Sequence, residues 1–392
     1  MPRRLTRKRP RPSREPLLTG VGESGLLHRL ATLLPGKPRW VLAGAGADDA
    51  AVVDVGAGEL WLLSCDVQCE GTHFERRWLD AYALGRRAAA VNLSDIAAMG
   101  GAARLALVSL LLPPRLPASF FDGVMRGLAD RFRAAGTTIV GGNIARSECL
   151  AVDVTVAGRV RREDLLRRSG ARPGDLVAVT GSPGDSAAGL ALLQRGAGRR
   201  GALVQRFLAP EPRLQAGAAL AALGATAAID VSDGISTDVL HLCDASGVDV
   251  EMHWEALPVS AALARAGRNL RTDPRHWVLH GGESYELLCT LPAARFESVR
   301  RGRLALPGFP LHAIGTILPP GSGRWLVRAG ERLPLVPASF EHFAAAKAVP
   351  SRRPARDWRA DVAPADSRRP RRPQRRQRAH PRRRPRPRPR RS

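Results

Sequence analysis

Short apolar runs alternate with helix-like stretches through the middle of this chain. Strands and helices that alternate in this way build sheets covered by helices, so the pattern predicts a mixed α/β fold. Strands are expected at 51–55, 60–65, 105–112, 152–160, 176–180, 227–231, 286–290 and 313–317. Helices are expected at 79–99, 186–195 and 235–246, each followed by a glycine that can end it.

The chain is long enough for two ordinary hydrophobic cores, since it has 392 residues and is 44% hydrophobic. A polar, arginine-rich stretch at 159–175 contains an Arg-Pro-Gly-Asp turn and separates the two halves. We therefore expect a basic disordered extension at 1–20, an N-terminal domain at 21–160, a C-terminal domain at 161–348 and a disordered Arg/Pro-rich tail at 349–392.

The net charge of +25 comes almost entirely from the two ends of the chain. Residues 1–14 hold seven basic side chains and no acid, and residues 351–392 hold eighteen arginines against three aspartates. The body keeps a charge of only +3. A tail of this composition buries too little apolar surface to fold. Two interpretations stay open: an arm that binds nucleic acid or another acidic partner, or a solvated extension without a partner.

The cysteines and the hydropathy pattern bear on the compartment. The five cysteines form no CxxC pair and show no zinc-like spacing to histidine. No run approaches the roughly 18 apolar residues of a membrane span, and the basic N-terminus lacks the apolar stretch of a signal peptide. We expect a soluble cytoplasmic protein with reduced thiols and no membrane partner.

Carboxylate and amide side chains cluster at strand ends, beside glycines and inside an apolar helix. Asp95 is the most informative, because it lies in the apolar stretch 90–99 with Asn92 one turn before it. An unpaired buried carboxylate costs several kcal/mol, so Asp95 needs a cation or a strong donor, which could also be the N-terminus of a neighbouring helix. The segments that share this character are 46–49, 64–66, 92–95, 141–143, 230–234 and 281–283.

The positions of these acids suggest a shared metal site. Asp49 precedes the strand at 51–55, Asp66 ends the strand at 60–65, and Asp230 and Asp233 end the strand at 227–231. Oxygen ligands without His or Cys favour Mg²⁺ beside phosphates. The alternative for Asp233, which precedes Gly234, is a simple turn or a helix N-cap.

A nucleotide would have to bind without a P-loop. No GxxxxGK[ST] motif occurs, and the three lysines are Lys8, Lys37 and Lys347. Phosphates would instead contact metal ions, arginines and the backbone N–H groups of glycine turns. The candidate turns are Gly141-Gly142 and the segment 181–184.

Taken in order, these segments resemble the thiamine-monophosphate kinase family, which shares a superfamily with aminoimidazole ribonucleotide synthetase and selenophosphate synthetase. The resemblance spans about residues 22–345 and is most specific at 91–100, 168–175, 179–190 and 229–234. It implies a two-domain PurM-like α/β fold and usually a homodimer. ATP would be the co-substrate, thiamine monophosphate the acceptor and several Mg²⁺ ions the cofactors.

The resemblance also assigns roles to single residues. The implied metal ligands are Asp49, Ser64, Cys65, Asp66, Asp95, Asn143, Asp230 and Asp233. The implied ATP contacts are Gly142, Asn143, Arg168 and Ser232, and those to thiamine monophosphate are His73, Glu283 and Phe340. The implied reaction is a direct in-line transfer without an acid or base, in which Arg168 and the metals stabilise charge.

Four positions depart from the family pattern. Asn143 and Ser284 replace aspartates, Cys65 replaces a threonine, and Ala47 replaces a glycine. An amide in place of a carboxylate loses a charge, and a thiol suits Mg²⁺ poorly unless the backbone carbonyl is the real ligand. We therefore expect a working enzyme that is slower or needs more Mg²⁺.

Two other readings compete with this one. A sister enzyme of the superfamily would show a reactive Cys and Lys near the N-terminus or end in a Cys, and neither feature occurs. A non-catalytic descendant that binds nucleic acid through its arginine-rich tails would best be marked by loss of Asp66, Asp95 or Asp233, and all three are present.

Overall fold

The computed structural model describes residues 18–34, 36–56, 58–302 and 309–338. These residues form two sheets, confirming the mixed α/β prediction. The predictions for residues 1–17, for the tail at 349–392 and for Phe340 lie outside the described residues. Helix α1 begins at Leu18, so residues 18–20 of the predicted N-terminal extension belong to a helix.

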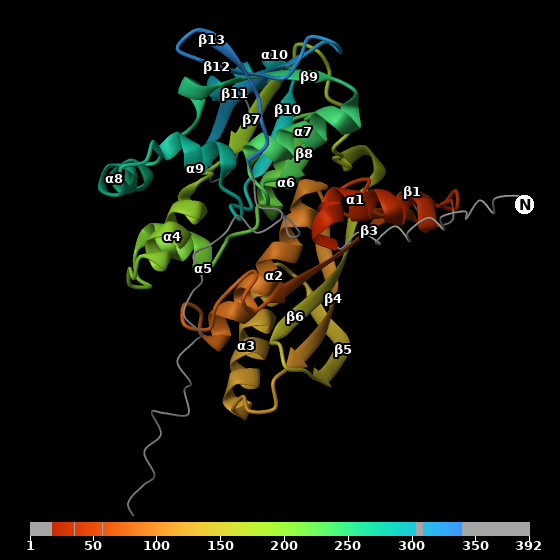
Figure 1. Cartoon of the computed structure of the whole chain (residues 1–392). Helices are drawn as coiled ribbons and strands as arrows, with labels where there is room; N and C mark the ends of the chain where they lie inside the picture. The colour runs from red at the N-terminus through yellow and green to blue at the C-terminus, as the bar shows by residue number, and fades with distance from the viewer. Residues whose placement is uncertain (1–17, 35, 57, 303–308, 339–392) are drawn as a thin grey trace, which may run out of the picture. The chain divides into compact units, whose positions relative to one another are not determined.

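The first sheet has six strands in the order β1-β2-β3-β6-β4-β5, antiparallel except for the β4–β5 pair. Helices α2 and α3 cover one of its faces (Figure 1). The helices of this half are α1 (Leu18–Leu33), α2 (Ala81–Ala98) and α3 (Ala118–Ala134). Its strands are β1 (Val41–Ala43), β2 (Ala51–Asp54), β3 (Glu59–Cys69), β4 (Ala102–Leu112), β5 (Thr138–Arg146) and β6 (Ala151–Arg161).

The second sheet has seven strands in the order β13-β12-β9-β11-β7-β10-β8. Its strands are β7 (Leu176–Thr180), β8 (Ala227–Asp230), β9 (Asp249–His253), β10 (Leu287–Leu291), β11 (Leu311–Leu318), β12 (Trp325–Arg328) and β13 (Glu331–Pro334). The 3-10 turns η1 (Arg162–Asp164) and η2 (Trp254–Ala256) precede and follow strands of this half.

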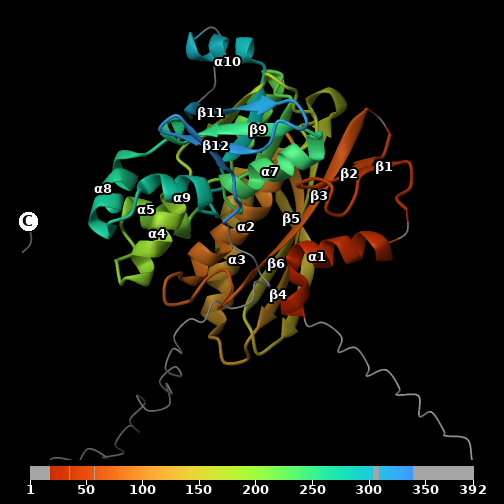
Figure 2. The same ribbon diagram turned by 45° about the horizontal axis from the view of Figure 1, so that its top comes forward.

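The helices of the second half are α4 (Asp185–Gln194), α5 (Ala202–Leu208), α6 (Leu214–Ala222), α7 (Ile235–Ser246), α8 (Ala261–Leu270), α9 (Pro274–His280) and α10 (Ala293–Arg300). Helices α4, α5, α8 and α9 pack together as one group (Figure 2). Helix α2 contacts β3 and β6 of the first sheet and also α6 and β8 of the second half. The predicted boundary near residue 160 coincides with the end of β6, and the division into separate domains stays a prediction.

Two local predictions were wrong. Asp66 does not end its strand, because β3 continues past it to Cys69, with every residue paired to β6. Gly141 and Gly142 do not form a turn but lie inside β5. Strand β4 approaches β5 so closely there that a Cβ atom on Gly142 would lie 1.8 Å from the carbonyl oxygen of Val108. Glycine at this position serves strand packing rather than a turn.

An N-cap residue sets the start of α2. The apolar periodicity alone placed this start two residues too early. Asp80 accepts a hydrogen bond from the N–H of Ala83 at 2.8 Å, so the helix begins at Ala81 rather than at Leu79. Gly234 is the residue that caps α7, and Asp233 stands just before it. The N-cap alternative for Asp233 is therefore not what the structure contains.

Helices α2 and α3 cross at a pair of glycines. A Cβ atom on Gly85 would lie 2.1 Å from the carbonyl oxygen of Val124, and one on Gly127 would lie 2.1 Å from that of Tyr82. Each glycine therefore lets the backbone of the other helix approach directly.

We expect Gly127→Ala to lower the free energy of unfolding by about 1–3 kcal/mol, because the added methyl forces the helices apart. Gly198→Ala is the matched control, since its added Cβ meets nothing within 4 Å. Urea unfolding of both variants checks this. Equal stability of the two variants would contradict the close crossing.

Candidate functional site

Helix α2 carries the acid that the sequence analysis ranked first. The Asp95 carboxylate accepts a hydrogen bond from the Ser64 hydroxyl of β3, so its direct donor is a strand residue rather than a helix N-terminus. Asn92, one turn earlier and fully buried, accepts a bond from the N–H of Asp66 at 2.9 Å and donates to the carbonyl of Ala88 at 3.0 Å. Asn92 thereby fixes α2 against the middle of β3, where Ser64 and Asp66 stand.

The end of β8 brings a second acid to the same helix. Asp230 is the last residue of β8 and is buried. Its carboxylate accepts a hydrogen bond of 2.6 Å from the Ser94 hydroxyl, and Ser94 is the neighbour of Asp95 on α2. Ser94 was not among the predicted site residues, although it lies inside the segment 92–95 that drew attention to Asp95. Acids from both sheets therefore meet at one turn of α2.

Two adjacent aspartates after β1 bind arginines. Asp49 accepts bonds from Arg168 Nε at 2.9 Å and Nη2 at 2.5 Å. Asp48 accepts a bond from the backbone N–H of Arg168 at 2.9 Å and one from Arg167 Nε at 3.2 Å. The second carboxylate oxygen of Asp49, Oδ2, is buried and has no hydrogen-bond partner in the described part of the chain. Asp48 acts structurally, and Asp49 keeps one oxygen for another ligand.

Four acids lie close enough for their charges to act on one another, and we call them the acidic cluster: Asp49, Asp66, Asp95 and Asp230. Burial raises the pKa of Asp49 to about 6 and that of Asp230 to about 8. The pKa of Asp95 is raised well above its usual value, first by burial and then by the charges of the other three. Buried carboxylates that repel one another are stabilised by a cation placed among them.

Three of the four acids nevertheless accept hydrogen bonds from protein donors: Asp49 from Arg168, Asp95 from Ser64 and Asp230 from Ser94. Among the residues that the structure describes, no group of three or more His, Cys, Asp or Glu side chains is arranged closely enough to hold a metal ion. The donor set itself is all oxygen, and the partnerless Asp49 Oδ2 gives it one buried free acceptor. In its chemistry, this set fits a hard divalent cation.

Cys65 lies on the other side of β3. Side chains alternate along a strand, and Cys65 stands between Ser64 and Asp66. Its sulfur is 3.3 Å from Asp153 Oδ1 and 3.4 Å from Thr155 Oγ1. The thiol therefore points away from the acidic cluster.

Gly142 and Asn143 lie on the far edge of the sheet. Gly142 pairs with Val108, Val108 with Val154, and Val154 with Asp66, so three strand spacings of about 4.8 Å separate Gly142 from the cluster in its own chain. The intervening valines are buried. The structure does not bring Gly142 or Asn143 to the acids.

The predicted substrate residues stand in two places. His73 follows β3, and its Nδ1 accepts a hydrogen bond from the N–H of Cys69 at 3.1 Å. Ser232 lies just after β8, and its carbonyl accepts a bond of 2.7 Å from the N–H of Glu283. Glu283 is thus joined to the segment that follows Asp230. Its side chain forms an ion pair with Arg87 of α2, a residue that the sequence analysis missed.

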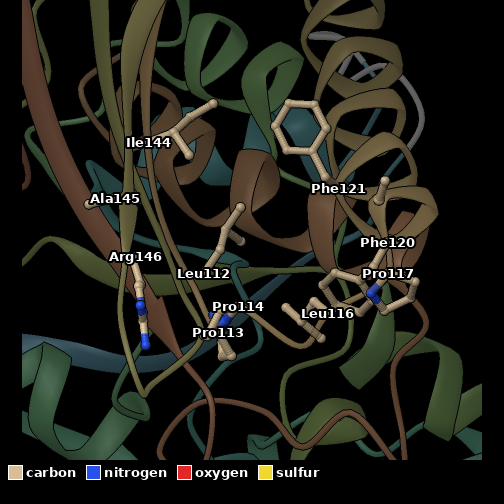
Figure 3. A pocket seen from close by; sticks show the side chains of 11 residues that line it. Leu112, Pro113, Pro114, Leu116, Pro117, Phe120, Phe121, Ile144, Ala145 and Arg146 are labelled. Carbon is tan, nitrogen blue, oxygen red and sulfur yellow. The ribbon is translucent and has the colours of Figure 1, made fainter.

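A separate apolar hollow of about 330 Å³ lies where β4 runs into α3. Figure 3 shows Phe121 of α3 and Ile144 of β5 on either side of Leu112, with Arg146 at the edge. None of the acidic cluster lines this hollow. It is therefore distinct from the candidate site.

Comparison with known proteins gives the class first. Residues 47–160 match the AIR synthase related protein N-terminal domain, and residues 172–323 match the AIR synthase related protein C-terminal domain. The chain is thus an AIR synthase-related protein with both domains of that class. A hydrogenase maturation protein HypE bound to ATP shares the fold at a TM-score of 0.59 with 19% identity.

Closer relatives narrow this class. The thiamine-monophosphate kinase of Escherichia coli K12 is 34% identical over 335 residues, covering 82% of this chain and 98% of the relative. That of Mycobacterium tuberculosis H37Rv is 38% identical over 274 residues, covering 70% and 81%. A structure titled AaThiL complexed with AMPPCP and TMP matches at a TM-score of 0.74 with 33% identity, covering 84% of this chain and all of that one. The chain belongs to the thiamine-monophosphate kinase family.

Proposed function

We propose that this chain transfers the γ-phosphoryl group of ATP to thiamine monophosphate, giving thiamine diphosphate and ADP. The acidic cluster carries the proposal, because it gathers carboxylates from both sheets at one turn of α2, with Asp230 buried against Ser94. Family relatives named for this activity support it, as does the similar structure bound to AMPPCP and TMP.

The reaction needs no general base. The phosphate of thiamine monophosphate is already anionic near neutral pH, so one of its oxygens can attack the γ-phosphorus as the bond to the bridging oxygen of ADP breaks. The work of the protein is to hold two polyanions in line and to balance their charge. Arg168, fixed by Asp48 and Asp49 beside the acids, is the residue that we assign to the ATP phosphates.

The acids would hold Mg²⁺. We assign this role to the acidic cluster together with Ser64 and Asp233, and to the backbone carbonyl of Cys65. Bound Mg²⁺ supplies positive charge to the phosphates as negative charge builds up in the transition state. Ser232 would contact ATP, and His73 and Glu283 would contact thiamine monophosphate, as would Phe340, which lies outside the described residues.

Three of the four departures from the family pattern bear on different parts of this site. The thiol of Cys65 faces away from the acids. A cysteine in place of the family's threonine therefore changes a side chain outside the acidic cluster and keeps the backbone carbonyl of this position. Ser284 donates to the carbonyl of Val231 at 3.1 Å and so has a structural partner. Asn143 removes a charge, which weakens any Mg²⁺ that depends on it.

We expect Asp95→Asn to lower thiamine diphosphate formation at least 100-fold, because it removes the central charge of the acidic cluster. The assay couples purified chain with ATP and thiamine monophosphate, with and without Mg²⁺. Asp122→Asn on α3 is the matched helical control and should retain activity. A folded wild-type chain that forms no product at high Mg²⁺ would contradict the proposal and favour a non-catalytic descendant.

A homodimer through the uncovered face of the first sheet is a further part of the proposal. We define the open face by the partly exposed leucines and valine that alternate away from α2 and α3: Leu63, Val67, Leu105, Leu107 and Leu111. These apolar side chains flank Asp153 and Thr155 of β6 on the same face, and a sheet face that exposes leucines and valine among a few polar groups is typical of a subunit interface. Asn143 shares a row with Ser109, Asp153 and Val67, so a second copy on this face would reach it.

We expect Leu107→Glu to convert a dimer into monomers, because a charge at the centre of an apolar interface is left unpaired. Leu107 is 47% exposed, so the monomer should tolerate the change. Leu333→Glu on β13, at a leucine that is 37% exposed, is the control. Light scattering after gel filtration measures the mass. A dimer that persists in Leu107→Glu, or a wild-type monomer, would contradict this interface.

No helix in the described part of the chain is long and apolar enough to cross a membrane. We propose that the enzyme acts in the cytoplasm, where ATP and Mg²⁺ are abundant. Binding of nucleic acid or another acidic partner by the tail stays a prediction.

A further inference from the structure

Arg87 is a fully buried arginine in the middle of α2, with 0% of its side chain exposed. Its Nε donates to Gln68 Oε1 of β3 at 3.0 Å, Nη1 donates to the carbonyl of Phe207 at the end of α5, and Nη2 donates to Glu283. The guanidinium also lies 4.7 Å from the centre of the Phe207 ring. Side chains from both halves of the molecule thus share this one cation.

The residue that Arg87 binds lies in a strained segment. Glu283 has φ 58° and Tyr285 has φ 53°, a left-handed conformation that non-glycine residues rarely adopt. The segment is held by hydrogen bonds from the N–H of Glu283 to the Ser232 carbonyl at 2.7 Å and from the N–H of Tyr285 to the Val231 carbonyl at 3.0 Å. Such conformations persist only where the surroundings enforce them, and they concentrate at functional sites.

A second arginine fixes the other end of this segment. Arg213 binds both carboxylate oxygens of Glu286, at 2.7 and 2.5 Å. Glu286 also accepts a bond from the Thr180 hydroxyl at 2.7 Å. Arg213 therefore holds the Glu286 end of the segment, and the ion pair with Arg87 holds the Glu283 end.

We propose that Arg87 is a positioning residue for the substrate, which holds the carboxylate of Glu283 where it binds the cationic end of thiamine monophosphate. This rests on the proposed function. The Glu283 side chain is 28% exposed, so the glutamate reaches the ligand and the arginine does not. The thiazolium ring of thiamine monophosphate carries a permanent positive charge, which a partly desolvated carboxylate attracts.

Helix α2 and the segment after β8 would then hold both ends of the substrate. The backbone of Glu283 is bonded to the residues directly after Asp230, and Arg87 lies two turns before Ser94 and Asp95 on α2. Loss of Arg87 leaves the acidic cluster in place but releases the Glu283 carboxylate, which would bind the thiazolium ring of thiamine monophosphate. The expected kinetic signature is a raised KM for thiamine monophosphate with little change in kcat.

The test compares Arg87→Met, Arg87→Lys, Glu283→Gln and the Arg87→Met/Glu283→Gln double variant. Arg131→Met is the matched control, because Arg131 is a similarly buried arginine of α3 that binds Glu211 and the Pro210 carbonyl. Steady-state kinetics give KM for each substrate, and thermal unfolding gives the stability of each variant.

We expect Arg87→Met to raise KM for thiamine monophosphate about 10-fold or more, with kcat and KM for ATP within about 3-fold. Arg87→Lys should recover part of the loss, and the double variant should be no worse than Glu283→Gln alone. Arg131→Met should lower Tm without raising KM. A KM for thiamine monophosphate that is unchanged in Arg87→Met, or raised equally in Arg131→Met, overturns the proposal.

Hydrogen exchange separates this proposal from the function on which it rests. The amides of Glu283 and Tyr285 should exchange faster in Arg87→Met and Glu283→Gln than in wild type and Arg131→Met. Equal protection in all four proteins overturns the positioning role even if the wild type is an active kinase. A folded wild type that does not phosphorylate thiamine monophosphate overturns the proposed function and the substrate assignment with it, whatever the exchange shows.

Discussion

Helix α2 is apolar along most of its length, yet four of its polar side chains face the interior and take their partners from the protein. Arg87 finds Glu283, Asn92 finds the backbone of Asp66, Ser94 finds Asp230, and Asp95 finds Ser64. Leaving any such group unpaired costs about 1–3 kcal/mol, and more for the charged ones. These four partners lie in both halves of the chain, so all four side chains of α2 are paired only when both sheets pack against the helix.

The same requirement creates the site. The partners of α2 are mostly acids, and gathering acids in a buried place raises their pKa values through desolvation and mutual repulsion. A fold that only needed stability would avoid this arrangement, because apolar side chains of similar size would fill the space at lower cost. The retained carboxylates make physical sense as a site that is completed by cations and by the phosphates they attract.

Sequence patterns predicted β7 and α7 at their observed bounds. They also predicted Asp95 as a buried acid that needs a partner. Sequence patterns could not predict which side chains pair, because no local feature connects Ser94 to Asp230 or Arg87 to Glu283. The members of the first pair are 136 positions apart and those of the second 196. Gly142 was assigned to a turn because glycine usually breaks strands, whereas here the close approach of β4 requires it.

In the proposed reaction the protein positions two polyanions for direct transfer and forms no covalent bond to either. The stereochemical course at the γ-phosphorus tests this most directly, using ATP made chiral there with sulfur and oxygen isotopes. One in-line displacement gives labelled thiamine diphosphate with the configuration at phosphorus inverted, which is the result we expect. Retention of configuration, which signals a phosphorylated enzyme intermediate, would contradict it.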